Sequence, residues 1–138
     1  MPLIPRNVKQ FLFLLLLGFP GDEALAQTKR DSLWAMWKDT SQPDTIRLQA
    51  SYKMVWEGYI YTQPDSAYYF SQLQYDFAEK TGNKKQMQKA VYTQAVSFWV
   101  KGDYLPALKY SRRSLALAEE INDNKGISNS LRDRKSVV

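Results

Sequence analysis

The residue types that most often perform catalysis are missing from this sequence. The 138 residues include no cysteine and no histidine, so a thiol nucleophile, a Cys-ligated zinc ion and a histidine general base are all excluded. Glu119 and Glu120 are neighbours on a predicted helix, where adjacent side chains diverge, so a solvated helix end is favoured over an acid/base pair. Gly82 and Gly102 are isolated and form no phosphate-binding loop. The sequence therefore predicts no enzyme, no catalytic residue, no cofactor and no metal site.

Large aromatic side chains are instead the residues whose spacing suggests binding. Aromatic residues make up 14% of the chain. At 3.6 residues per helical turn, two helix faces each carry a stripe of three large side chains: Tyr52, Trp56 and Tyr59, and then Tyr92, Val96 and Trp99. Each stripe is either a surface for a protein or peptide partner or packing between helices, and both interpretations stay open. Of the two tryptophans, we expect Trp99 to be the more structural.

The basic charge of the chain gives little support to a nucleic-acid partner. The formal net charge is +5, and the densest group of lysines (Lys80, Lys84, Lys85 and Lys89) crosses a predicted helix junction. Lysines near helix ends complement the helix dipole and need no ligand. Positive charge is the only feature of the sequence that would support nucleic-acid binding, so we expect no nucleic-acid partner.

The elements that position these residues are predicted to be helices. Short runs of turn and cap residues divide the chain beyond residue 26 into helix-length stretches, and none of these alternates as a strand would. The expected helices span residues 29–38, 45–61, 65–81, 84–101 and 104–121, with another beginning near 124. Asp65 and Asp103 are expected N-caps, and Gly82 an expected helix C-terminal residue.

The pattern of these helices repeats after forty residues. Ala67 then aligns with Ala107, Ala78 with Ala118, Tyr52 with Tyr92, Tyr59 with Trp99 and Lys85 with Lys125. Apolar positions meet apolar ones, small residues meet small ones, and the breaks coincide. The sequence therefore contains two copies of one helical hairpin and the beginning of a third copy. Such hairpins are expected to bury their apolar faces by stacking into a right-handed solenoid.

The segment from Gly102 through Asp103, Tyr104 and Ala107 to Tyr110 resembles the second helix of a tetratricopeptide (TPR) repeat. The resemblance covers residues 44–131 and implies an all-α fold of antiparallel helical hairpins stacked as a TPR-like right-handed solenoid. In that family the stripe-bearing face of each first helix lines a concave groove that holds peptides. The pattern departs from the family at Ser111, where a large aromatic is usual, and in the first copy at Gln63.

The order of the N-terminal segments resembles bacterial exported TPR regions that precede a membrane helix and a cytoplasmic signalling domain of adenylate or guanylate cyclase, histidine kinase or DNA-binding type. This resemblance implies an interaction module of a signal-transduction protein, with no catalytic residue in this chain. A free-standing secreted scaffold without an effector domain is the alternative.

Both ends of the chain are expected to lie outside the repeats. Arg6 and Lys9 precede a short apolar run and a small-x-small site ending at Ala26, so residues 1–26 are predicted to be a signal peptide cleaved before Gln27. Residues 27–43 form a short helix and linker, and 132–138 are predicted to be a non-native tail, because 133–138 match a translated sequencing adapter. Export of the mature chain to the periplasm or another extracytoplasmic compartment is therefore expected.

The chain is expected to contact a membrane only through an uncleaved signal peptide or through a missing downstream segment. Self-association through the uncapped end of the stack is a further expectation.

Overall fold

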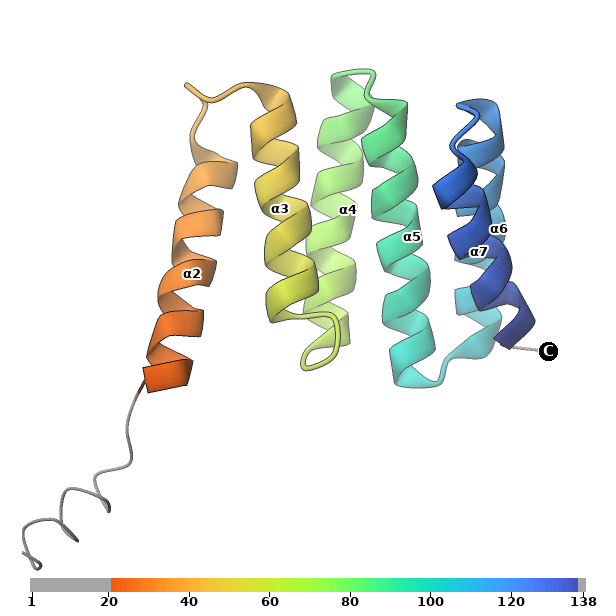
Figure 1. Ribbon diagram of the computed structural model, residues 1–138, viewed down its shortest axis with the longest axis horizontal. Coiled ribbons are helices and arrows are strands. Elements are labelled where there is room, and N and C mark those ends of the chain that lie inside the picture. The colour runs from red at the N-terminus through yellow and green to blue at the C-terminus, as the bar shows by residue number, and fades with distance from the viewer. Residues whose placement is uncertain (1–20, 137–138) are drawn as a thin grey trace, which may run out of the picture.

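The structure, a computed structural model, describes residues 21–136, and every regular element in that range is an α-helix (Figure 1). The helices follow one another in the order α2 (Gly21–Lys38), α3 (Asp44–Gly58), α4 (Pro64–Lys80), α5 (Lys84–Lys101), α6 (Tyr104–Glu120) and α7 (Asn124–Ser136). Consecutive helices run antiparallel, and each packs against the next along the molecule (Figure 1). The predicted all-α fold class is confirmed.

Alternate helices also contact one another, and these contacts divide the helices into two layers. α2 meets α4 through Trp34 and Phe70, whose ring centroids are 5.6 Å apart. α4 meets α6 where the hydroxyl groups of Tyr68 and Tyr110 lie 2.8 Å apart. α3 meets α5 through Trp56, and α5 contacts α7. One layer therefore holds α2, α4 and α6, and the other holds α3, α5 and α7.

The turns after α4, α5 and α6 share one backbone conformation. Gly82, Gly102 and Asn122 have positive φ angles of 67°, 80° and 54°. In each turn the next N–H reaches back to a carbonyl five residues earlier, as from Asn83 to Ala78 at 2.8 Å. Glycine and asparagine tolerate the left-handed conformation that this closure requires. The prediction of Gly82 as a helix C-terminal residue is confirmed.

The helix caps differ from those predicted. Asp65 lies inside the first turn of α4, and Asp103 occupies the N-cap position of α6, but neither carboxylate caps a backbone N–H. Asp65 instead accepts a hydrogen bond from Lys101 at 2.6 Å. The side-chain cap that does form is Asn83, which accepts from the backbone N–H of Gln86 at 3.2 Å. An ion pair with the neighbouring helix therefore replaces the predicted cap at Asp65.

Two helices also differ in their limits. α2 begins at Gly21, eight residues before the predicted start at 29, because Asp22 and Glu23 favour a first turn and alanine and leucine follow. The predicted cleavage site therefore lies within a helix. α3 ends at Gly58 instead of residue 61, because the chain then turns to place Ile60 in the core at 1% exposure.

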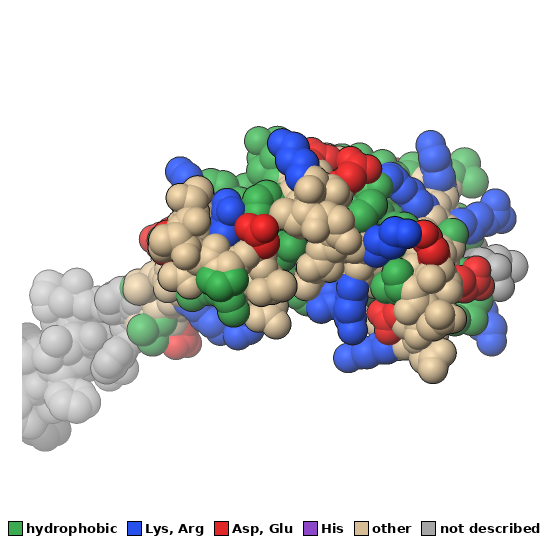
Figure 2. Space-filling model, turned by 90° about the horizontal axis from the view of Figure 1, so that it is seen from above, with side chains coloured by type: hydrophobic (Ala, Val, Ile, Leu, Met, Phe, Trp, Pro, Cys, Tyr) green, Lys and Arg blue, Asp and Glu red, His purple; other side chains and the backbone are tan. Residues whose placement is uncertain are grey.

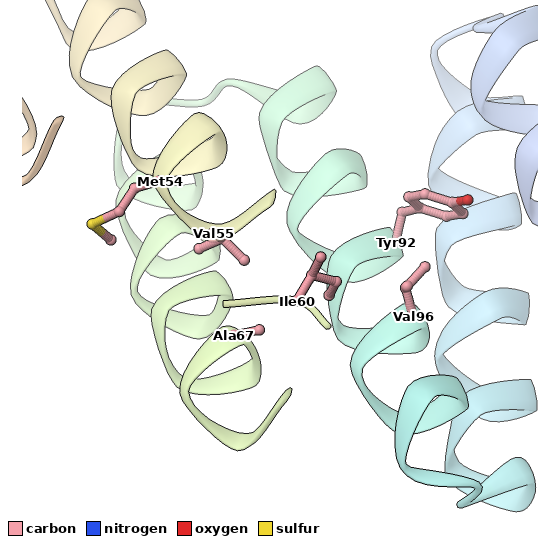
Figure 3. Packing of buried hydrophobic residues seen from close by; sticks show 6 residues of the cluster. All are labelled: Met54, Val55, Ile60, Ala67, Tyr92 and Val96. Carbon is pink, nitrogen blue, oxygen red and sulfur yellow. The ribbon is translucent and has the colours of Figure 1, made fainter. Parts of the chain in front are cut away.

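The apolar core is built mainly from large side chains of α3, of α5 and of the turn after α3, packed against small alanines of α4 and α6. Met54, Val55, Ile60, Ala67, Tyr92 and Val96 form its central cluster (Figure 3). The four alanines that align across the forty-residue repeat are each no more than 2% exposed: Ala67, Ala78, Ala107 and Ala118. Small residues at equivalent positions let neighbouring helices approach closely in both copies.

Candidate functional site

The structure brings four of the six predicted groove residues together. Trp56, Tyr92, Val96 and Trp99 line a hollow of about 350 Å³ on the α3–α5–α7 layer, which we call the aromatic hollow. Its remaining walls are Tyr61, Arg132 and Asp133. Tyr61 and Arg132 come from elements that the stripe analysis did not include, the α3–α4 turn and α7.

The other two predicted residues lie elsewhere. Tyr59 packs against Phe70 of α4, with ring centroids 5.1 Å apart, and supports the core instead of lining the hollow. Tyr52 lines a second hollow next to the first, and Tyr92 borders both. The helical stripe therefore splits, because α3 ends at Gly58 and Tyr59 leaves its face.

Trp56 joins α3 to α5. Its indole Nε1 donates a hydrogen bond to the Thr93 hydroxyl at 3.0 Å, and its ring stacks on Tyr92 with centroids 6.0 Å apart. Thr93 is completely buried. Trp56 therefore serves both interpretations left open by the sequence, because it is a packing residue whose outer edge lines the hollow.

Trp99 and Tyr61 supply the accessible aromatic surface of the hollow. Trp99 is 44% exposed and Tyr61 is 69% exposed. The expectation that Trp99 is the more structural tryptophan is therefore wrong: Trp99 lies near the C-terminal end of α5, where α3 has already ended. Exposed aromatic side chains beside a buried aromatic floor are the arrangement that binds an apolar side chain of a partner.

Tyr92 forms the floor between the two hollows. Burial raises its pKa to about 12, and the charge and hydrogen bond of Asp133 add to this rise, while Arg132 opposes it. The phenol therefore stays protonated and acts as a packing and hydrogen-bonding group. Arg132 and Asp133 belong to the segment predicted as a non-native tail, and the structure places both within α7.

The second hollow, of about 290 Å³, is basic, and we call it the lysine hollow. Lys85 and Lys89 of α5 and Lys125 of α7 line it, together with Tyr52, Gln88, Tyr92, Asp123, Gly126 and Asn129. Burial lowers the pKa of Lys89, and the charges of Lys85 and Lys125 lower it further, against the opposite effect of Asp123. The Lys89 ammonium lies 5.2 Å from the centre of the Tyr52 ring.

The lysine group found in the sequence is thereby divided. Lys84 forms an ion pair with Glu120, whereas Lys85 and Lys89 turn toward Lys125. No site was predicted at these lysines, although the forty-residue alignment of Lys85 with Lys125 is the signal that could have revealed one. Figure 2 shows acidic and basic side chains interspersed on the end of the molecule that carries the turns after α2, α4 and α6, and not one continuous basic patch.

A further hollow of about 560 Å³ lies beside α2, where all five lining residues, from Glu23 to Arg30, belong to that single helix. A concavity with walls from one helix positions no ligand from two sides. Within residues 21–136, no helix is both long and apolar enough to cross a bilayer, and no three acidic side chains gather as a metal site would require.

Comparison with protein-family models, with curated proteins and with solved structures finds no match to this chain. The two hollows and the internal repeat are therefore the features of the molecule that indicate its function.

Proposed function

We propose that this chain is a protein-interaction module of TPR type, whose α3–α5–α7 layer binds an extended or helical segment of a partner protein. The observation that carries the proposal is the aromatic hollow, where exposed Trp99 and Tyr61 border a floor of Trp56, Tyr92 and Val96. The floor joins two repeats, so the face exists only when the hairpins stack.

The repetition of structure supports the TPR part of the proposal. Residues forty apart adopt the same role twice, as with the left-handed turns at Gly82 and Asn122 and the buried alanines Ala78 and Ala118. Sequence and packing thus repeat with the same period, which is the property expected of a stacked array.

The cellular role follows from the resemblance to exported TPR regions. We propose an extracytoplasmic region of a signal-transduction protein, and a free-standing secreted scaffold is the alternative. Sequencing the locus beyond the codon for Leu131 separates the two: a membrane helix and effector domain downstream support the first, and a stop codon after further repeats supports the second.

Peptide display on the purified chain tests the binding function. Peptides enriched on the chain should lose affinity at least about tenfold with Trp99→Ala, because a central aromatic residue typically contributes 1–2 kcal/mol or more to an interface. Tyr69→Ala is the matched control: Tyr69 is 59% exposed but lies on α4, in the opposite layer. Equal losses for the two variants, or enrichment that neither affects, would place binding elsewhere.

A further inference from the structure

Three lysines line the lysine hollow, and within residues 21–136 none of them forms an ion pair with a carboxylate. Other lysines form ion pairs between helices, for example Lys29 with Glu57 at 2.7 Å and Lys101 with Asp65 at 2.6 Å. Asp123 is the single acidic residue lining the hollow, which therefore has a formal excess of two positive charges.

The surroundings of Lys89 make a bound anion favourable. The ammonium is half-buried and lies over the Tyr52 ring, with Lys85 and Lys125 as charged neighbours. Burial and like charges both disfavour its charged form. An anion placed among the three lysines would offset both effects, and removal from bulk water strengthens its attraction to each lysine.

The two hollows are adjacent, because Tyr92 lines both, so one extended ligand can reach both. Both follow α5, with Lys89 seven residues before Val96 and Lys85 fourteen residues before Trp99. At 1.5 Å per helical residue these separations are about 10 Å and 21 Å. An extended peptide advances about 3.3 Å per residue, so three to six of its residues cover the same distance.

Resting on the proposed function, we propose that the partner segment is acidic: a carboxylate side chain binds among Lys85, Lys89 and Lys125, three to six residues from an apolar side chain seated in the aromatic hollow between Val96 and Trp99. The small volume and aromatic borders of the hollow suit one or two carboxylates better than a nucleic-acid backbone, which needs a continuous basic track. The interspersed charges in Figure 2 agree with this choice.

Peptide display followed by calorimetric titration of the full chain tests the inference. Enriched peptides should carry Asp or Glu at the stated spacing from Trp, Phe or Leu. Lys89→Gln or Lys125→Gln should weaken the best peptide roughly tenfold each, as expected for charge-assisted hydrogen bonds. Lys109→Gln is the control, because it removes the same charge from an exposed position on α6. Circular-dichroism melts of each variant establish that it is folded.

A double-mutant cycle identifies the contact. Replacing the peptide Glu by Gln should cost the wild-type chain about as much affinity as Lys89→Gln does, and should cost the Lys89→Gln chain much less. Equal binding of the Glu and Gln peptides would overturn the acidic-segment inference. If Trp99→Ala still weakened such a peptide, the proposed function would stand without it.

Two other results would indicate a different ligand for the lysine hollow, either a free anion or a nucleic acid. Inorganic phosphate that displaces the peptide at millimolar concentration or below would assign the hollow to a free anion. A single-stranded oligonucleotide that binds more tightly than the acidic peptide would assign it to nucleic acid. Either result overturns the inference. The Trp99→Ala, Lys89→Gln double variant is the reference for the peptide display. If no peptide is enriched on the wild-type chain relative to this double variant, both the inference and the proposed function are overturned.

Discussion

The two tryptophans of the aromatic hollow are expected to differ sharply in their effect on stability. Trp56→Ala removes the ring stacked on Tyr92 and leaves the buried Thr93 hydroxyl without its indole donor. Truncating a buried Trp typically costs about 3–5 kcal/mol. Because Trp56 keeps one edge at the surface, we expect a loss of about 3 kcal/mol in the free energy of unfolding.

Trp99→Ala should cost about 1 kcal/mol, because 44% of this residue is already in solvent and its indole side chain makes no ring pair or hydrogen bond within residues 21–136. One kcal/mol lowers Tm by roughly 4–8 °C in a domain of about 100 residues. The expected losses are therefore at least about 12 °C for Trp56→Ala and only about 4–8 °C for Trp99→Ala.

Thermal unfolding followed by the helical circular-dichroism signal measures both values under identical conditions. Trp56→Phe serves as a further control, because it keeps most of the ring area and removes the indole donor; it should recover more than half of the loss. Equal Tm shifts for the two alanine variants would refute the division into floor and exposed wall. A larger decrease in Tm for Trp99→Ala than for Trp56→Ala would show that the end of α5 contributes more to core packing than Trp56 does.

Three further predictions concern the turns, the helix packing and alkaline pH. Gly102→Ala should cost about 1 kcal/mol in urea unfolding, because φ there is 80°, whereas Gly21→Ala, with no atom of residues 21–136 within 4 Å of the new Cβ, should be neutral or slightly stabilising. Ala118→Leu should cost about 1–3 kcal/mol by overpacking a site that is 0% exposed, and Ala116→Leu on the exposed side of the same helix should change Tm little; equal effects would contradict the close helix approach. The pKa of Tyr92 is raised from 10 to about 12 in the folded state, so its contribution to stability is complete below pH 10 and is lost as pH rises toward 12. Tyr92→Phe should flatten the fall in unfolding free energy over that interval, and an unchanged slope would show that other groups control it.

The helical pattern was predictable where local signals mark both ends of a helix. The limits of α5 agree with the prediction, since Gly82 and Asn83 precede it and Gly102 follows it. The end of α3 was not predictable from periodicity, because Tyr59 and Ile60 continue an apolar pattern while the chain leaves the helix. What places Ile60 is its burial at 1% exposure, and burial depends on α4 and α5 being in position.

The candidate site was predictable where one helix carries it and not where three elements meet. The α5 stripe of Tyr92, Val96 and Trp99 lines the aromatic hollow as a set. The lysine hollow required Lys125 of α7 to approach Lys89 of α5, a contact between segments far apart in the chain. The forty-residue alignment held the relevant signal, but charge at repeated positions is uninformative until the stacking direction is known.

The uniform left-handed turns have a consequence for how such a chain can grow. Gly82, Gly102 and Asn122 are spaced twenty residues apart and close the backbone in the same way. A forty-residue segment, such as the hairpin between the turns at Gly82 and Asn122, can therefore be duplicated or exchanged without disturbing the register of any other helix. A deletion of one residue within α5 would instead rotate every later side chain by about 100° relative to the preceding layer. The length of the binding face is thus free to change between genes only in whole hairpins, and its recognition can change one hairpin at a time.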